Sequence, residues 1–143
     1  MSVVKSKRGQ GKLTVYTRAN ELAIYTVTIC SNEKHFPKRY RWCITNKIVE
    51  SALTINNCVA AANSIYIADG DEDAKKLRKQ YQIKALAETY ALLSMIDMAY
   101  RTFGIESSRI EFWARLVKEV QTLLRSWKKS ENKYYNDLWR DKP

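Results

Sequence analysis

Apolar residues recur every three or four positions along most of this chain, which is the period of an amphipathic α-helix. Four such stripes lie in four segments that contain neither glycine nor proline, at about residues 12–36, 38–69, 71–103 and 105–142. Glycine and proline cost about 1 and 3 kcal/mol in a helix interior relative to alanine. Their absence from these segments favours four long helices, and none of the segments shows the strict alternation that indicates a strand.

Each stripe predicts the face of a helix that is buried in a common core. The first stripe comprises Leu13, Tyr16, Ala19, Ala23, Val27 and Cys30. The second comprises Ile44, Ile48, Ala52, Ile55, Val59 and Ala62. The third comprises Leu77, Tyr81, Leu86, Leu93, Ile96, Ala99 and Phe103. The fourth comprises Ile110, Trp113, Val117, Val120, Leu124 and Trp127.

Charged residues and glycines indicate where the helices begin and end. The acidic run Asp71–Asp73 opens the third helix with negative charge, and Gly104 suits the C-terminus of that helix. The run Ser108–Glu111 has the form of a capping box that starts the fourth helix. Because the links between the segments are short, we expect consecutive helices to be antiparallel neighbours.

These features predict an all-α, single-domain protein that forms an antiparallel up-down-up-down four-helix bundle. We expect the bundle to span residues 12–130, with a flexible basic N-terminal arm at 1–11 and a C-terminal tail at 131–143. Hydrophobic residues make up 45% of the chain, which is enough to build a core. No apolar run reaches the ~18 residues of a membrane span. An odd, sparse count of three cysteines fits a reducing cytoplasm.

The net charge of +10 indicates a binding partner, because so basic a domain repels itself unless a polyanion or an assembly uses the charge. The excess is clustered, at +4 over residues 34–41 and +5 over residues 75–84, both without an acidic residue. Tyr40, Trp42 and Trp127 interleave with the basic residues, as suits phosphate contact combined with base stacking. The candidate nucleic-acid contacts are Lys38, Arg39, Arg41, Lys75, Lys76, Arg78, Lys79, Arg125, Lys128 and Lys129.

The expected bundle divides these candidates between its two ends. Residues 75–79 and 125–129 should be spatial neighbours at one end, and residues 38–41 should lie at the other.

The residue patterns that indicate an enzyme are not found in this sequence. It has one histidine, His35, and its cysteines lack the spacing of a metal or redox site. The acidic residues from Asp69 onward match the first ligand positions of an EF-hand loop, but Ala74 and Gln80 stand where that loop needs glycine and glutamate. Helix capping is therefore favoured over a cation site, and we expect no catalytic residue, metal or cofactor.

Five blocks of sequence carry a family resemblance: Leu13–Thr17, Ser31–Lys38, Thr45–Glu50, Ile110–Trp113 and Trp127–Ser130. From about residue 13 to residue 129, the chain resembles the accessory variability determinant (Avd) proteins of bacterial and phage diversity-generating retroelements. The Phe-Pro-Lys within the second block is shared with a wider relative. That relative is the four-helix-bundle protein encoded in intervening sequences of bacterial 23S rRNA genes.

The resemblance implies a four-helix bundle that assembles as a homopentamer with a basic surface. Avd proteins bind nucleic acid and a reverse transcriptase, which makes mutagenic cDNA from a template RNA for retrohoming, and they have no known catalytic residues. Arg78 and Lys79 are the strongest candidates for the face that binds nucleic acid or the polymerase.

Three alternatives stay open from the residues. They are an RNA-binding bundle of the intervening-sequence type without a polymerase partner, an RNA-processing enzyme, and a protein-interaction scaffold.

Overall fold

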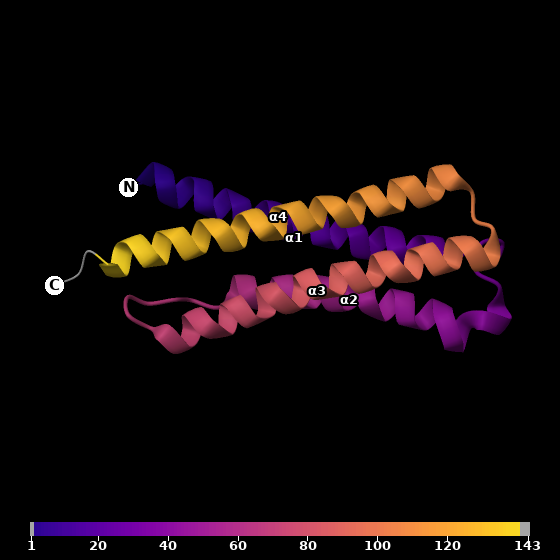
Figure 1. Cartoon of the computed structure of the whole chain (residues 1–143), viewed down its shortest axis with the longest axis horizontal. Coiled ribbons are helices and arrows are strands. Elements are labelled where there is room, and N and C mark those ends of the chain that lie inside the picture. Colours follow the sequence, from indigo (N-terminus) through magenta and orange to yellow (C-terminus); the bar gives the residue numbers. More distant parts are fainter. Residues whose placement is uncertain (1, 141–143) are drawn as a thin grey trace.

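The computed structural model describes the backbone of residues 2–140 and the side chains of residues 11–134. This part of the chain folds into four α-helices and contains no strand, which confirms the all-α prediction (Figure 1). The helices are α1 (Ser2–Cys30), α2 (Asn46–Ser64), α3 (Glu72–Phe103) and α4 (Ser107–Arg140). Two short helical turns precede α2, the 3-10 turn η1 (Lys38–Tyr40) and the π-helical turn η2 (Arg41–Thr45).

The four helices lie side by side around a shared core. Each helix packs against the next one in the chain, and α4 also packs against α1. In Figure 1 the α1–α2 and α3–α4 links lie at one end of the molecule and the α2–α3 link lies at the other. None of the described helices is long and apolar enough to cross a membrane.

The core confirms two of the expected stripes and corrects the other two. In α3 the expected stripe is partly wrong, since Leu77 is exposed and the buried face is formed by Arg78, Gln82, Ala85, Thr89, Leu92, Ile96 and Ala99. In α2 and α4, residues of the expected stripes such as Ile48, Ile55 and Trp113 are fully buried. In α1 the stripe that includes Leu13, Tyr16 and Val27 is partly wrong, since these three side chains are exposed. The buried face of α1 is instead formed by Val15, Ala19, Leu22, Ala23, Thr26, Ile29 and Cys30. Apolar residues occupy two faces of α1, so periodicity alone did not identify the face that packs.

Two of the three expected end signals are confirmed. The Asp71 side chain accepts a hydrogen bond from the Ala74 amide at 3.1 Å and caps the N-terminus of α3. Gly104 follows α3 with a φ of 65°, the left-handed conformation that glycine adopts without strain. The expected capping box at Ser108–Glu111 is displaced, because α4 begins at Ser107 and Ser108 already lies in its first turn.

Two expected segment boundaries differ from the structure. The backbone of residues 2–11, expected to be a flexible arm, is helical and continues directly into the rest of α1. That stretch contains no proline, and each of its two glycines, Gly9 and Gly11, weakens a helix by only about 1 kcal/mol. Glu131, assigned to the tail, is 5% exposed and bonded within the bundle. The packed part of α4 therefore continues beyond residue 130.

Candidate nucleic-acid interface

The N-terminal part of α3, which carries the basic segment 75–79, packs beside α4. The Arg78 Nη1 of α3 lies 2.7 Å from the Glu131 Oε1 of α4. Nearer the middle of both helices, the Arg125 guanidinium lies over the Tyr90 ring, 5.5 Å from its centroid. These contacts show that α3 and α4 pack side by side, with Arg78 opposite Glu131 and Arg125 opposite Tyr90. Neither contact joins segment 75–79 to segment 125–129, so the expected pairing of those two segments stays a prediction.

The outer face of α4 carries a row of cations without a counter-charge. Between residues 112 and 134 these cations are Arg115, Lys118, Arg125, Lys128, Lys129 and Lys133. We call them the α4 cationic face. All are exposed except Lys128, which is half-buried. None forms a salt bridge with a residue whose side chain the structure describes.

The acidic residues within the same stretch of α4 are both paired with arginines of other helices. Glu119 lies 2.9 Å from the Arg18 Nε of α1, and Glu131 is bonded to Arg78. The hydrogen bond that Arg18 donates to Glu21, together with the charges of Glu119 and Glu21, raises the pKa of Arg18. Between residues 112 and 134, the two acids are thus paired with neighbouring helices, and the exposed charged side chains of this stretch are cations.

Three members of the α4 cationic face surround a shallow hollow of about 300 Å³. It is lined by Arg125, Lys128, Lys129 and Asn132. Guanidinium, ammonium and amide groups all donate hydrogen bonds, so the hollow suits an anion such as a backbone phosphate. On the adjacent helix Lys76 and Lys79 are exposed and Lys75 is half-buried.

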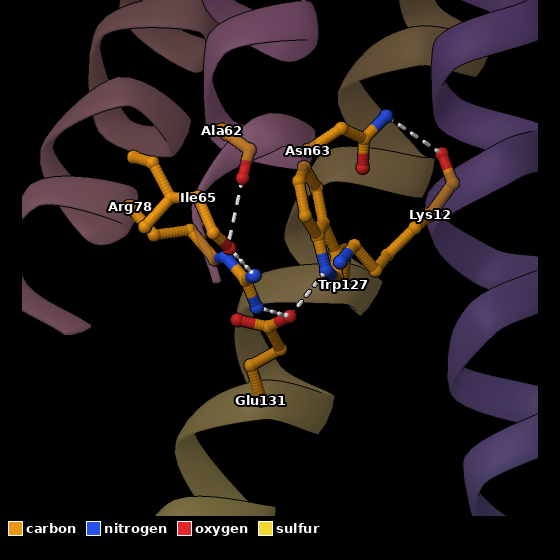
Figure 2. A network of polar contacts seen from close by, with 7 residues as sticks. All are labelled: Lys12, Ala62, Asn63, Ile65, Arg78, Trp127 and Glu131. Atoms are coloured by element: carbon orange, nitrogen blue, oxygen red, sulfur yellow. Dashed lines mark hydrogen bonds and ion pairs between the residues drawn. The ribbon is translucent and has the colours of Figure 1, made fainter. Parts of the chain in front are cut away.

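Arg78 is not part of an exposed patch, so its prediction as a surface contact is wrong. Its side chain is buried, and its Nη1 donates to Glu131 while its Nε donates to the Ala62 carbonyl at 3.2 Å (Figure 2). Its Nη2 donates to the Ile65 carbonyl, and the Trp127 Nε1 donates to the same Glu131 oxygen at 2.8 Å. We call these five residues the Arg78 clasp.

The clasp has a clear physical cause. The last carbonyls of a helix lack partners within that helix, and the C-terminus of α2 carries partial negative charge. A guanidinium offers five donors in a fixed plane, and its buried charge requires the carboxylate of Glu131. The spacing of Arg78, Gln82, Ala85 and Thr89 along one buried face of α3 was the sequence signal for this position.

The three remaining candidate contacts lie outside the α4 cationic face. Lys38, Arg39 and Arg41 are exposed on η1 and η2, at the opposite end of the molecule from the start of α3 (Figure 1). Arg41 lies 3.8 Å from Glu33, and both side chains are largely in solvent. Salt bridges between exposed side chains of this kind contribute little to the free energy of folding.

Sequence reasoning missed Arg115, Lys118 and Lys133 of the α4 cationic face. Their signal was present, because the cations at 115, 118, 125, 129 and 133 recur at helical spacing with few acidic residues between them. Glu106, Glu111 and Glu119 precede or interrupt this row in the sequence and lower the net charge of the segment, although Glu119 is paired with Arg18 of α1 in the fold.

Thiol reagents are expected to modify Cys43 in the native protein well before the other two cysteines. Cys43 is exposed, whereas Cys30 and Cys58 are buried. Burial raises the pKa of the Cys30 thiol to about 12, and it also raises the pKa of Cys58. Because the thiolate is the reactive form, a short maleimide treatment should place one label per chain, measured by mass spectrometry. Equal labelling of all three cysteines in the folded protein would contradict this burial.

Among residues 11–134, no group of three or more histidine, cysteine, aspartate or glutamate side chains is arranged to hold a metal ion. Comparisons of the chain with protein-family models, curated proteins and solved structures give no match.

Proposed function

We propose that this chain is a non-enzymatic, nucleic-acid-binding accessory subunit of a diversity-generating retroelement. In this role it binds the reverse transcriptase and the template RNA or its cDNA, and it supports mutagenic cDNA synthesis and retrohoming. The observation that carries the nucleic-acid part is the α4 cationic face, whose charges have no acidic partner among the described side chains. The polymerase partner is proposed from the sequence resemblance to Avd proteins.

The geometry of the α4 cationic face suits a phosphate backbone. From Arg115 to Lys133 the helix advances about 27 Å, at 1.5 Å per residue. Successive helical turns are about 5.4 Å apart, so the cations form a line along which several phosphates can be contacted at once. Contacts to phosphates do not read base identity, so we expect RNA and DNA to bind with little sequence preference.

The finer architecture is part of the proposal. We propose a single-domain, up-down-up-down bundle that forms a homo-oligomer, a pentamer by resemblance, in the cytoplasm of a bacterium or phage-infected cell, with no membrane partner. The exposed apolar side chains on α1 support an assembly, because contiguous apolar surface marks protein interfaces. They are Leu13, Tyr16, Ile24 and Val27.

Salt dependence tests the nucleic-acid role. We expect the purified protein to bind RNA with a log–log slope steeper than about −4 between about 50 and 200 mM salt, because each neutralised phosphate releases counterions. Fluorescence anisotropy with labelled RNA measures this slope. If the protein fails to bind RNA even at the lowest salt, the nucleic-acid role is wrong and a protein-interaction scaffold becomes the better explanation.

Co-purification with the reverse transcriptase encoded beside this chain tests the accessory role. RNA binding without retention of that polymerase would favour the alternative, an RNA-binding bundle of the 23S rRNA intervening-sequence type. Metal-dependent turnover of RNA, abolished by replacement of one carboxylate, would instead indicate an RNA-processing enzyme.

A further inference from the structure

The link between α1 and α2 presents a tryptophan to solvent at the end of the molecule opposite the Arg78 clasp. Trp42 lies in η2 and is 82% exposed, although a side chain of this size is normally largely buried. The π-helical form of η2 is uncommon, and such turns occur frequently at functional sites. Neither the packing of the core nor the α4 cationic face accounts for this side chain.

The backbone on either side of Trp42 is held firmly by the core. The Tyr40 ring packs on Phe103 at 5.2 Å, and Phe36 lies 5.5 Å from Phe103 and 6.0 Å from the buried Trp113. On its other side, Thr45 at the end of η2 is buried. The exposed indole is therefore carried by a fixed platform, which limits the conformational entropy that a ligand must remove on binding.

Cations outnumber acids in the segment that forms this platform. Residues 33–50 contain five lysines and arginines, Lys34, Lys38, Arg39, Arg41 and Lys47, and two acids, Glu50 and Glu33, the second of which lies 3.8 Å from Arg41. The Arg39 guanidinium lies over the Tyr40 ring, 5.0 Å from its centroid, and Tyr40 is two residues before Trp42 in the chain. An exposed aromatic face bordered by cations combines the two elements that bind single-stranded nucleic acid, a stacking surface and phosphate contacts.

We propose that this turn binds an unpaired base of single-stranded nucleic acid. The base stacks on the Trp42 indole, and Lys38, Arg39 and Arg41 contact the flanking phosphates. The inference rests on the proposed function and deepens it, because it names single strands as the preferred substrate. In a continuous duplex both faces of each base are covered by neighbouring bases, so an indole can stack only where a base is unpaired.

Charge and side-chain type favour this ligand over a protein partner. An acidic peptide would use the cations, but it has no need of an indole face. An apolar pocket on a partner protein would accept leucine at this position as well as an aromatic ring. The substitutions Trp42→Phe and Trp42→Leu separate these cases, since phenylalanine keeps a stacking face and leucine keeps only apolar surface.

The experiment measures tryptophan emission and affinity with two probes, an oligouridine and a fully paired RNA duplex with the same number of phosphates. The oligouridine should quench the emission of the unaltered protein, and Trp42→Phe should remove most of this quenching while keeping the affinity within about threefold. Trp42→Leu should weaken oligouridine binding about tenfold and leave duplex binding and the salt slope unchanged. Circular dichroism checks that both variants keep the helical fold, as expected for so exposed a side chain.

The results separate this inference from the proposed function. If Trp42→Leu binds oligouridine as tightly as the unaltered protein, and quenching persists in Trp42→Phe, the stacking site is wrong while nucleic-acid binding by α4 stands. If the unaltered protein binds neither probe at low salt, both proposals fail.

Discussion

Replacing Arg78 by alanine is expected to lower the free energy of unfolding by about 3–5 kcal/mol, the range found when one partner of a buried ion pair is removed. The substitution leaves the buried Glu131 carboxylate with only the Trp127 Nε1 as a hydrogen-bond donor in the clasp. It also removes the donors to the carbonyls of Ala62 and Ile65 at the end of α2. Urea denaturation followed by circular dichroism measures the loss, at one protein concentration because self-association shifts apparent stability.

Lys79→Ala is the matched control for this prediction. Lys79 follows Arg78 on the same helix and is exposed, so its loss should change stability by no more than about 0.5 kcal/mol. Glu131→Gln should also lower the free energy of unfolding, because the buried Arg78 charge then lacks its carboxylate, although an amide oxygen can still accept the Trp127 hydrogen bond. If Arg78→Ala and Lys79→Ala unfold at the same urea concentration, Arg78 is not a structural residue and returns to the candidate surface contacts.

The helical class and the buried faces of α2 and α4 followed from periodicity, because each of these helices has one dominant apolar face. The face of α1 did not, because Leu13 and Ile24 extend an apolar surface on the side that the neighbouring helices leave open. Local pattern measures how apolar a face is, but the other helices determine which face is covered. Tertiary packing therefore decided the orientation of α1.

The candidate site was also predictable only in part, because the local sequence does not determine which side chains the other helices bury. The short link between α3 and α4 correctly predicted that the two helices pack together, but the contacts pair Arg78 with Glu131 and Arg125 with Tyr90, and none joins residues 75–79 to residues 125–129. The clustering of charge could not distinguish Arg78 from Lys79, because both are cations and the direction in which each side chain points around α3 decides which one is buried. The partner of Arg78 lies 53 residues away on α4, in a segment that sequence reasoning assigned to the tail.

Reversing three charges on the α4 cationic face is expected to abolish most nucleic-acid binding. We expect Lys118→Glu, Arg125→Glu and Lys129→Glu together to weaken the affinity for single-stranded RNA at least 100-fold at about 0.1 M salt. The log–log salt slope should fall by about two to three, because up to three phosphate contacts are lost. Fluorescence anisotropy across a salt titration measures both quantities. All three side chains are exposed, so circular dichroism should show unchanged helicity.

A second triple variant separates the effect of position from the effect of total charge. Lys84→Glu, Arg101→Glu and Arg109→Glu change the net charge by the same amount at exposed positions outside α4's cationic row. Arg101 and Arg109 already lie beside Asp97 and Glu106, so their charges are partly neutralised in the unaltered protein. We expect this variant to lose less than about fivefold in affinity, through weaker long-range attraction alone. Equal losses in the two triple variants would show that RNA responds only to net charge, and the α4 cationic face would then have no special role.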